Sequence, residues 1–149
     1  MTGFVDLGGG APGDVPPGAL IFVTDTDQRI LLQLRDDWDH VNWPGHWGLF
    51  GGGAEPEDQD LTHTAQREFY EEVGLHLELS RFVPMARLTA TSERRTALFV
   101  YRLQGSLSPA DITLGEGAGF GFFNAAQAAN LPLVPSSAQV VAHWRQQFV

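Results

Sequence analysis

Short apolar runs separated by polar turns make up the first third of the chain. After an opening segment dense in Gly and Pro, residues 19–25 and 29–35 are rich in Leu, Ile and Val, with a short polar link between them. Apolar and β-branched runs bounded by turn residues are typical of β-strands. The pattern predicts an irregular arm over residues 1–17, then two paired strands joined by a tight connection.

The apolar spacing changes at residue 61. Leu61, Ala65, Phe69 and Val73 follow one another at intervals of four, which predicts a helix with one buried face. Gly74 stands directly after the last of them and is expected to end this helix.

Strands and helices alternate in the remainder of the chain. Val140, Trp144 and Phe148 recur every four residues behind a Ser cap, which predicts an amphipathic C-terminal helix. Interleaved strands and helices favour an α/β fold with a mixed sheet, and the length suits a single domain over residues 18–149. Further strands are expected within residues 76–90, 95–103 and 119–123.

The charge limits the partners of the protein. Eighteen Asp and Glu against nine basic residues give a formal charge of −9, which argues against binding to a nucleic acid duplex. A small phosphorylated ligand remains compatible with this charge if divalent cations bridge carboxylates to phosphate oxygens.

Two further classes are excluded by composition. The chain has no cysteine, so it can form neither disulfides nor thiolate metal sites. The longest apolar run, residues 19–23, is too short to cross a bilayer, and the N-terminus lacks the features of a signal peptide. We therefore expect a cytoplasmic protein with no membrane partner.

Three tryptophans surround a Pro-Gly turn in the segment before the glycine triplet. Trp38, Trp43 and Trp47 are expected to bury against the core or a neighbouring chain, so a homodimer is possible. Stacking on a ligand is the alternative.

The helix predicted over residues 61–73 carries a face of carboxylates. At 3.6 residues per turn, Glu68, Glu71 and Glu72 share one face, to which Thr64 also belongs. Like charges at this spacing are mildly destabilising, and Arg67 or a hard divalent cation such as Mg²⁺ or Mn²⁺ would offset them. A solvated acidic surface is the alternative, and the glutamates alone would favour it.

The glycine triplet at residues 51–53 changes that balance, because glycine lets the backbone approach a bound ion closely. The stretches "GLFGGGAEP" and "REFYEEVGL", at their observed separation, resemble the Nudix box. This pattern consists of Gly, five residues, Glu, seven residues, and then Arg-Glu-apolar-any-Glu-Glu-any-Gly-apolar. Every specified position of its second half is matched, by Arg67, Glu68, Phe69, Glu71, Glu72, Gly74 and Leu75.

The first half of the box is altered. If Gly52 begins it, Asp58 replaces the glutamate and the gap to Arg67 is one residue longer; if Gly53 begins it, Gln59 replaces the glutamate. We favour the alignment with Asp58, because "EPED" resembles the acidic turn common in the family.

The resemblance extends from about residue 19 to the end of the chain. It implies an α/β/α sandwich and a metal-dependent hydrolase that cleaves the pyrophosphate linkage of a nucleoside diphosphate derivative, such as a nucleoside triphosphate, including damaged ones, or a nucleotide sugar. It also implies functions for individual residues: Mg²⁺ or Mn²⁺ binding by Glu68, Glu72 and the Gly52 carbonyl with Glu71 close by, carboxylate orientation by Arg67, and phosphate contact by Arg35.

The general base is not fixed by the motif. Glu68 is one candidate and Glu116, in the loop "LGEGAGFG", is another, although an ordinary loop acid is the simpler interpretation of Glu116. Arg94 and Arg95 are left out of the predicted site, because exposed arginines at a strand end often bind nothing specific. Because the first glutamate is altered, a weakened nucleotide-binding or regulatory module is the alternative to an enzyme.

Overall fold

A computed structural model describes residues 2–38 and 42–148 of the chain. The Phe148 side chain, predicted on the buried face of the last helix, lies outside the described part. The β-strands are β1 (Val5–Asp6), β2 (Gly18–Phe22), β3 (Ile30–Leu34), β4 (Trp47–Gly48), β5 (Phe50–Gly53), β6 (Phe82–Thr89), β7 (Ala97–Leu103) and β8 (Gly119–Phe123). The α-helices are α1 (Leu61–Val73), α2 (Ala125–Ala129) and α3 (Pro135–Phe148), and two short 3-10 helices, η1 (Leu79–Arg81) and η2 (Pro109–Asp111), complete the elements.

The strands form two sheets. The larger has the order β1-β6-β7-β2-β5 and is mixed, because β1 runs parallel to β6 and β2 parallel to β7, while the other neighbours are antiparallel. The smaller is antiparallel with the order β4-β3-β8.

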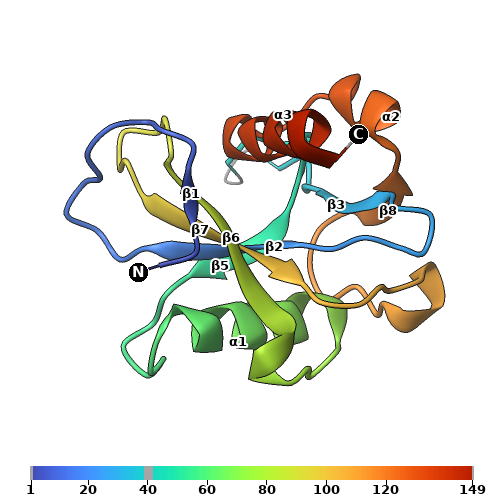
Figure 1. Ribbon diagram of the computed structural model, residues 1–149, viewed down its shortest axis with the longest axis horizontal. Helices are drawn as coiled ribbons and strands as arrows, with labels where there is room; N and C mark the ends of the chain where they lie inside the picture. Colours follow the sequence, from blue (N-terminus) through green and yellow to red (C-terminus); the bar gives the residue numbers. More distant parts are fainter. Residues whose placement is uncertain (1, 39–41, 149) are drawn as a thin grey trace.

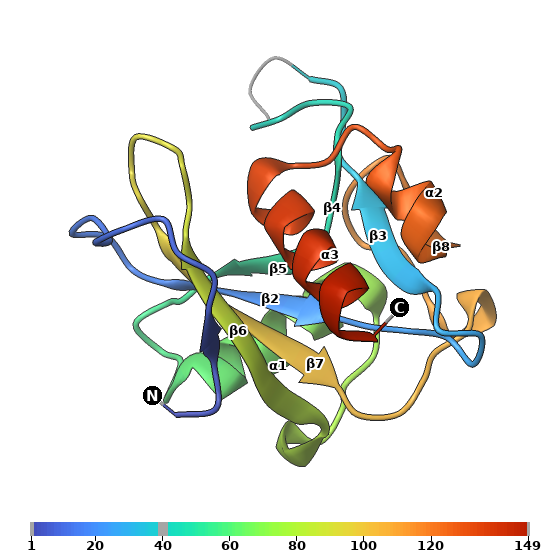
Figure 2. The same ribbon diagram turned by 45° about the horizontal axis from the view of Figure 1, so that its top comes forward.

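Helices cover both faces of the larger sheet. Helix α1 lies against one face, and α3, with α2 beside it, lies against the other (Figures 1 and 2). The α/β/α sandwich with a mixed sheet, predicted from the sequence, is thereby confirmed.

Strand β2 explains why there are two cores. Its side chains alternate between the faces: Ala19 and Ile21 pack with Phe69 of α1, whereas Phe22 packs with Trp144 of α3, with ring centroids 5.6 Å apart. The glutamate helix and the C-terminal helix therefore pack on opposite sides of the same strand.

The predicted pairing of residues 19–25 with 29–35 holds only beside the turn, where the Leu31 amide donates to the Val23 carbonyl at 2.9 Å and the Asp25 amide donates to the Arg29 carbonyl at 3.0 Å. Strands β2 and β3 belong to different sheets, and within the described part of the chain they meet at the isolated bridge Thr24–Ile30. The reason is that β2 is already paired on both edges, with β5 and β7, so β3 pairs with β4 and β8 instead.

The helix boundaries follow from their end residues. The Asp60 carboxylate accepts a hydrogen bond from the His63 amide at 3.0 Å and caps the start of α1, and Gly74, with φ of 78°, ends it as predicted. The expected Ser cap of α3 is wrong, because this helix begins at Pro135. Proline suits the first helical turn, where its missing N–H has no partner to lose. Ser137 instead accepts a hydrogen bond from the Leu49 amide at 2.9 Å.

The N-terminal segment packs on the sheet. Strand β1 pairs with β6, and Phe4 makes edge-to-face contacts with Phe99 and Tyr101, with ring centroids 5.2 and 5.3 Å apart. No helix among the described residues is long and apolar enough to cross a membrane.

Candidate active site

Arg67 binds the carboxylates of Asp58 and Glu68 through hydrogen bonds. Its guanidinium donates two hydrogen bonds of 2.9 Å to Asp58, from Nε to Oδ1 and from Nη2 to Oδ2. It also donates to Glu68 at 3.0 Å and to the Gly53 carbonyl at 3.1 Å. Planar two-point pairing of this kind fixes orientation as well as charge. The result is a guanidinium that joins the acidic turn, the glycine strand β5 and helix α1.

Asp58 is bound in this position by more than Arg67. Its Oδ2 also accepts from the Thr64 hydroxyl and from the Glu55 amide, both at 2.9 Å, and its side chain is buried. The hydrogen bonds from Arg67 hold the pKa of the Asp58 carboxyl well below its usual range, despite its burial. Of the two residues that could replace the first glutamate of the box, Asp58 therefore pairs with Arg67, whereas Gln59 is exposed.

Glu72 is the most deeply buried of the three glutamates. Its Oε1 accepts a hydrogen bond of 2.9 Å from the Gly51 amide, and 5% of the residue is exposed. Burial, followed by the charge of Glu68, raises the pKa of Glu72 to about 8, although the Gly51 amide opposes this shift. A carboxyl in such surroundings is one whose charged form a bound cation would stabilise.

The glycines of β5 provide the room for these carboxylates. A Cβ on Gly52 would collide with the Glu68 carboxyl, and a Cβ on Gly51 would collide with the Ala19 carbonyl oxygen of the neighbouring strand. Burial raises the pKa of Glu68 as well, with Arg67 opposing the shift. The two carboxyls thus lie directly against a strand whose backbone is uncovered.

Glu71 takes a different direction. Its side chain is 54% exposed and lies 3.4 Å from the Arg67 guanidinium. Among residues 2–38 and 42–148, no group of three or more His, Asp or Glu side chains is gathered closely enough to hold a metal ion. The structure brings Glu68 and Glu72 to β5 and leaves Glu71 at the surface. All of these donors are oxygen atoms, which suit Mg²⁺ or Mn²⁺.

Glu116 approaches the site on a loop that is fastened to the end of α1. The Gly115 amide donates to the Glu72 carbonyl at 2.8 Å, and Gln33 Nε2 donates to the Glu116 carbonyl at 2.8 Å. The negative charge of Glu116 contributes to the raised pKa values of Glu68 and Glu72. The Glu116 residue is exposed, and its backbone is held between the end of α1 and Gln33.

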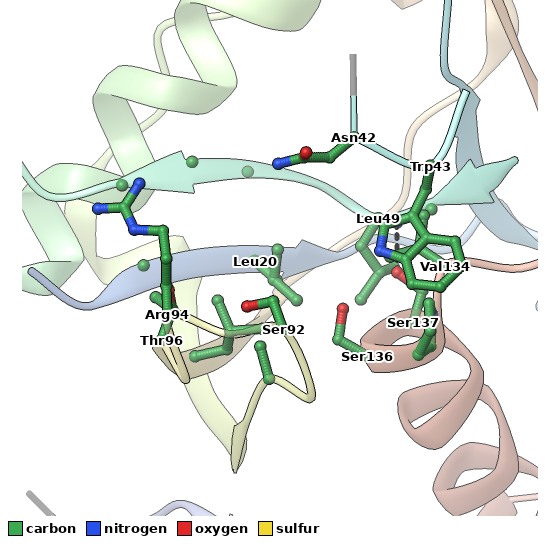
Figure 3. A pocket seen from close by; sticks show the side chains of 18 of the residues that line it. Leu20, Asn42, Trp43, Leu49, Ser92, Arg94, Thr96, Val134, Ser136 and Ser137 are labelled. Carbon is green, nitrogen blue, oxygen red and sulfur yellow. Dashed lines mark hydrogen bonds between the residues drawn. The ribbon is translucent and has the colours of Figure 1, made fainter. Parts of the chain in front are cut away.

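A cavity of about 770 Å³ lies on the other side of the glycine strand. Gly51–Gly53 of β5 and Arg35 are among the residues that line it, and Figure 3 shows Trp43 and Arg94 at two other parts of its wall. The positive charge of Arg35 lowers the pKa of Glu72, in opposition to the larger effect of burial, so this arginine is within electrostatic range of the glutamates. The remaining walls come from residues 90–96, from the start of α3 and from the segment around Trp43.

The tryptophans do not behave alike. Trp47 packs in the core against Phe123, with ring centroids 5.0 Å apart, as expected. Burial against the core is wrong for the other two, since Trp38 is 58% and Trp43 46% exposed, and burial against a neighbouring chain stays a prediction. Trp43 lines the cavity, where an aromatic face is available to a ligand.

Three parts of the site were not predicted from the sequence. The resemblance to the box assigns a function to Gly52 and none to Gly51, whose amide donates a hydrogen bond to Glu72. The sequence places Asp58 where the box has its first glutamate, but it does not show that Asp58 binds Arg67. Arg94 and Arg95 are left out of the predicted site, yet the loop 90–96 forms one wall of the cavity. For the first of these a signal existed, because the edge of a strand next to an acidic helix is where a free amide would be used.

Comparison with known proteins identifies the class to which this fold and site belong. The family model of the NUDIX domain matches residues 14–144. The chain therefore belongs to the Nudix family, as its box predicted.

Individual relatives match shorter stretches. "Nudix hydrolase 3" of Arabidopsis thaliana is 42% identical over 62 residues, which are 42% of this chain and 8% of that protein. "Diphosphoinositol polyphosphate phosphohydrolase 3-alpha" of Mus musculus is 31% identical over 81 residues, 54% of this chain and 46% of that protein. The chain thus spans less than half the length of these curated relatives.

Solved structures share the fold over most of the chain. The MutT NUDIX hydrolase from Burkholderia pseudomallei has a TM-score of 0.71 at 21% identity, covering 85% of this chain and 95% of that one. The NUDIX domain of Shewanella oneidensis NrtR, complexed with ADP ribose, has a TM-score of 0.68 at 18% identity, covering 100% of this chain and 91% of that one. At these identities the similarity establishes the fold.

Proposed function

We propose that the protein is a divalent-metal-dependent hydrolase that cleaves the pyrophosphate linkage of a nucleoside diphosphate derivative. The observation that carries the proposal is the placement of the buried Glu72 carboxyl, with Glu68 beside it, against the glycine strand that also lines the cavity. Carboxylates on one side of a backbone strand and a cavity on the other suit a diphosphate held at the strand.

The donors available to a cation fit Mg²⁺ or Mn²⁺. Glu68 and Glu72 would hold it together with backbone oxygen of the Gly51–Gly52 segment, and Glu71 would join only by turning from its exposed position. When bound, such an ion supplies charge neutralisation at the phosphates and a lowered pKa for water.

The protein's own groups serve the same chemistry. Arg67 keeps Glu68 oriented toward β5, and Arg35 is placed to contact a phosphate from the cavity side. Glu68 and Glu116 are the candidates for taking the proton from the attacking water: Glu68 lies against β5, and the charge of Glu116 contributes to the raised pKa of Glu68.

Nucleotide-type substrates follow from the family and from the cavity. The NrtR domain binds ADP ribose, and we propose a ligand of that chemical kind, a nucleotide sugar or a nucleoside triphosphate, for this chain. A cytoplasmic location and a possible homodimer stay predictions of the sequence.

The proposal is tested by hydrolysis. Purified protein is incubated with ATP, ADP ribose and UDP-glucose in Mg²⁺, in Mn²⁺ and in EDTA, and the products are separated by chromatography. We expect cleavage between phosphates that needs the cation and that falls by about a hundredfold or more in Glu72→Gln. Near-normal turnover in this variant, folded as the wild type, would refute the assignment of Glu72.

A binding module without turnover is the alternative. The altered first glutamate of the box is the reason for considering it. However, Asp58 pairs with Arg67, and Glu68 and Glu72 lie beside the strand, which supports the enzyme. A binder would raise the melting temperature with nucleotide and cation yet release no product.

A further inference from the structure

Two adjacent arginines in the loop 90–96 take opposite directions. Arg94 lines the cavity, whereas Arg95 does not and instead contacts the N-terminal arm. Arg95 also has φ of 52°, a left-handed conformation that is uncommon for a residue with a side chain. The two neighbouring side chains therefore have different surroundings.

Arg95 fastens the loop to the arm. Its Nε and Nη2 donate to the Ala11 carbonyl at 2.9 and 2.6 Å, and Nη2 also donates to the Gly9 carbonyl at 3.2 Å. Its own carbonyl accepts from the Gly13 amide at 2.8 Å. The arm lies so close that a Cβ on Gly13 would collide with the Arg94 carbonyl oxygen. The loop is therefore held at several points by residues 9–13 of the arm, none of which is among the residues that line the cavity.

Arg94 has no comparable partner. Within residues 2–38 and 42–148, no hydrogen bond or ion pair engages its guanidinium. Figure 3 shows this side chain rising from its loop toward the glycine strand β5. A guanidinium that faces a cavity without an acceptor is suited to an anionic ligand, and phosphate oxygens match its geometry.

The cavity offers few positive charges. Arg35 and Arg94 are the basic residues among those that line it, and Glu93 lies beside Arg94. Two arginines can balance part of the negative charge of a chain of two or three phosphates. A ligand with many phosphate groups carries far more negative charge than they can balance, and the glutamates would repel it as well.

We propose that Arg94 binds a phosphate oxygen of a substrate with two or three phosphates, and that Arg95 positions it by fastening the loop 90–96 to the arm. This inference rests on the proposed hydrolase activity. Arg94 is then a substrate-binding residue, and Arg95 a positioning residue that acts through it. The N-terminal arm becomes part of the support of the binding wall.

The test compares Arg94→Gln, Arg95→Gln and the double variant, with Arg102→Gln, an exposed position on β7, as the matched control. Steady-state kinetics are measured with whichever of ATP and ADP ribose the wild type hydrolyses faster, in Mg²⁺. We expect KM to rise about tenfold in Arg94→Gln with kcat little changed, and by a smaller factor in Arg95→Gln. The double variant should have the KM of Arg94→Gln alone.

Each outcome decides a separate point. An unchanged KM in Arg94→Gln overturns the inference while leaving the hydrolase intact, whereas a wild type that cleaves none of the substrates overturns the proposed function itself. Effects on KM that multiply in the double variant would show that Arg95 does not act through Arg94. A lowered melting temperature in Arg95→Gln with normal KM would leave it a purely structural residue and overturn its positioning role.

Discussion

Arg67 and Asp58 are joined by two hydrogen bonds of equal length, 2.9 Å, between the helix and the acidic turn that precedes it. Asp58 therefore acts on the site through an arginine. Because the Asp58 side chain is buried and also accepts hydrogen bonds from Thr64 and the Glu55 amide, removing its charge leaves several donors without their acceptor.

We expect Asp58→Asn to lower the free energy of unfolding by about 2 kcal/mol, because hydrogen bonds to a charged group are lost. Its kcat should fall as well, since Arg67 no longer has a fixed orientation toward Glu68. Urea denaturation and hydrolysis assays measure the two effects. Gln59→Ala, at the exposed neighbouring position, is the control and should match the wild type in both. The reverse result would favour the alignment that begins at Gly53.

A methyl group on Gly52 should disturb the site more than the fold. In Gly52→Ala the Cβ displaces the Glu68 carboxyl from β5, so we expect weaker Mn²⁺ binding by calorimetry. Gly53→Ala is a matched control, because a Cβ at Gly53 meets no atom within 4 Å. Equal Mn²⁺ affinity in the two variants would mean that Glu68 need not lie against the strand to bind the ion.

Glu116→Gln distinguishes the two candidates for the general base. If Glu116 takes the proton from water, kcat should fall by about a hundredfold or more while KM and Mn²⁺ affinity change little. The variant keeps the Gln33 hydrogen bond, which is made to the backbone carbonyl of residue 116. A kcat near that of the wild type would leave Glu68 as the candidate.

Asp25 predicts how stability depends on acid. Burial raises the pKa of its carboxyl, but hydrogen bonds from the Arg29 amide and side chain, the latter at 2.7 Å, outweigh this and lower it. A lowered folded-state pKa gives stability that is complete well above about pH 4 and is lost as the pH falls toward the folded-state value.

We therefore expect Asp25→Asn to be less stable than the wild type at pH 7, by about 2 kcal/mol, and the difference to shrink toward pH 2. Urea denaturation across this range measures it. Asp27→Asn, whose side chain is 74% exposed, should show a far smaller effect. A difference for Asp25→Asn that does not change with pH would point to packing in place of charge.

Local order was predictable from the sequence where one pattern decided it. The bounds of α1 follow from the spacing of Leu61 to Val73 and from Gly74, and β8 coincides with the predicted residues 119–123. The family followed from the second half of the box, which is a fixed sequence on one helix.

Relations between distant segments were not predictable in the same way. Whether β2 pairs with β3 depends on β5 and β7, which compete for its edges and stand far from it in sequence. The partner of Asp58 depends on the path of the turn 54–60, and the contacts of Arg95 depend on where residues 9–13 of the arm lie. The sequence shows that these residues are present but not which of them lie close together in the folded chain.

Because the protein has two cores on either side of β2, substitutions in one core need not disturb the packing of the other. The helix with the glutamates packs in one core, while the start of α3 and residues 90–96 line the cavity on the opposite face. Side chains in the cavity wall can therefore be exchanged without repacking the helix that carries the carboxylates. Substitutions in residues 90–96 or at the start of α3 should therefore leave the packing of α1 unchanged.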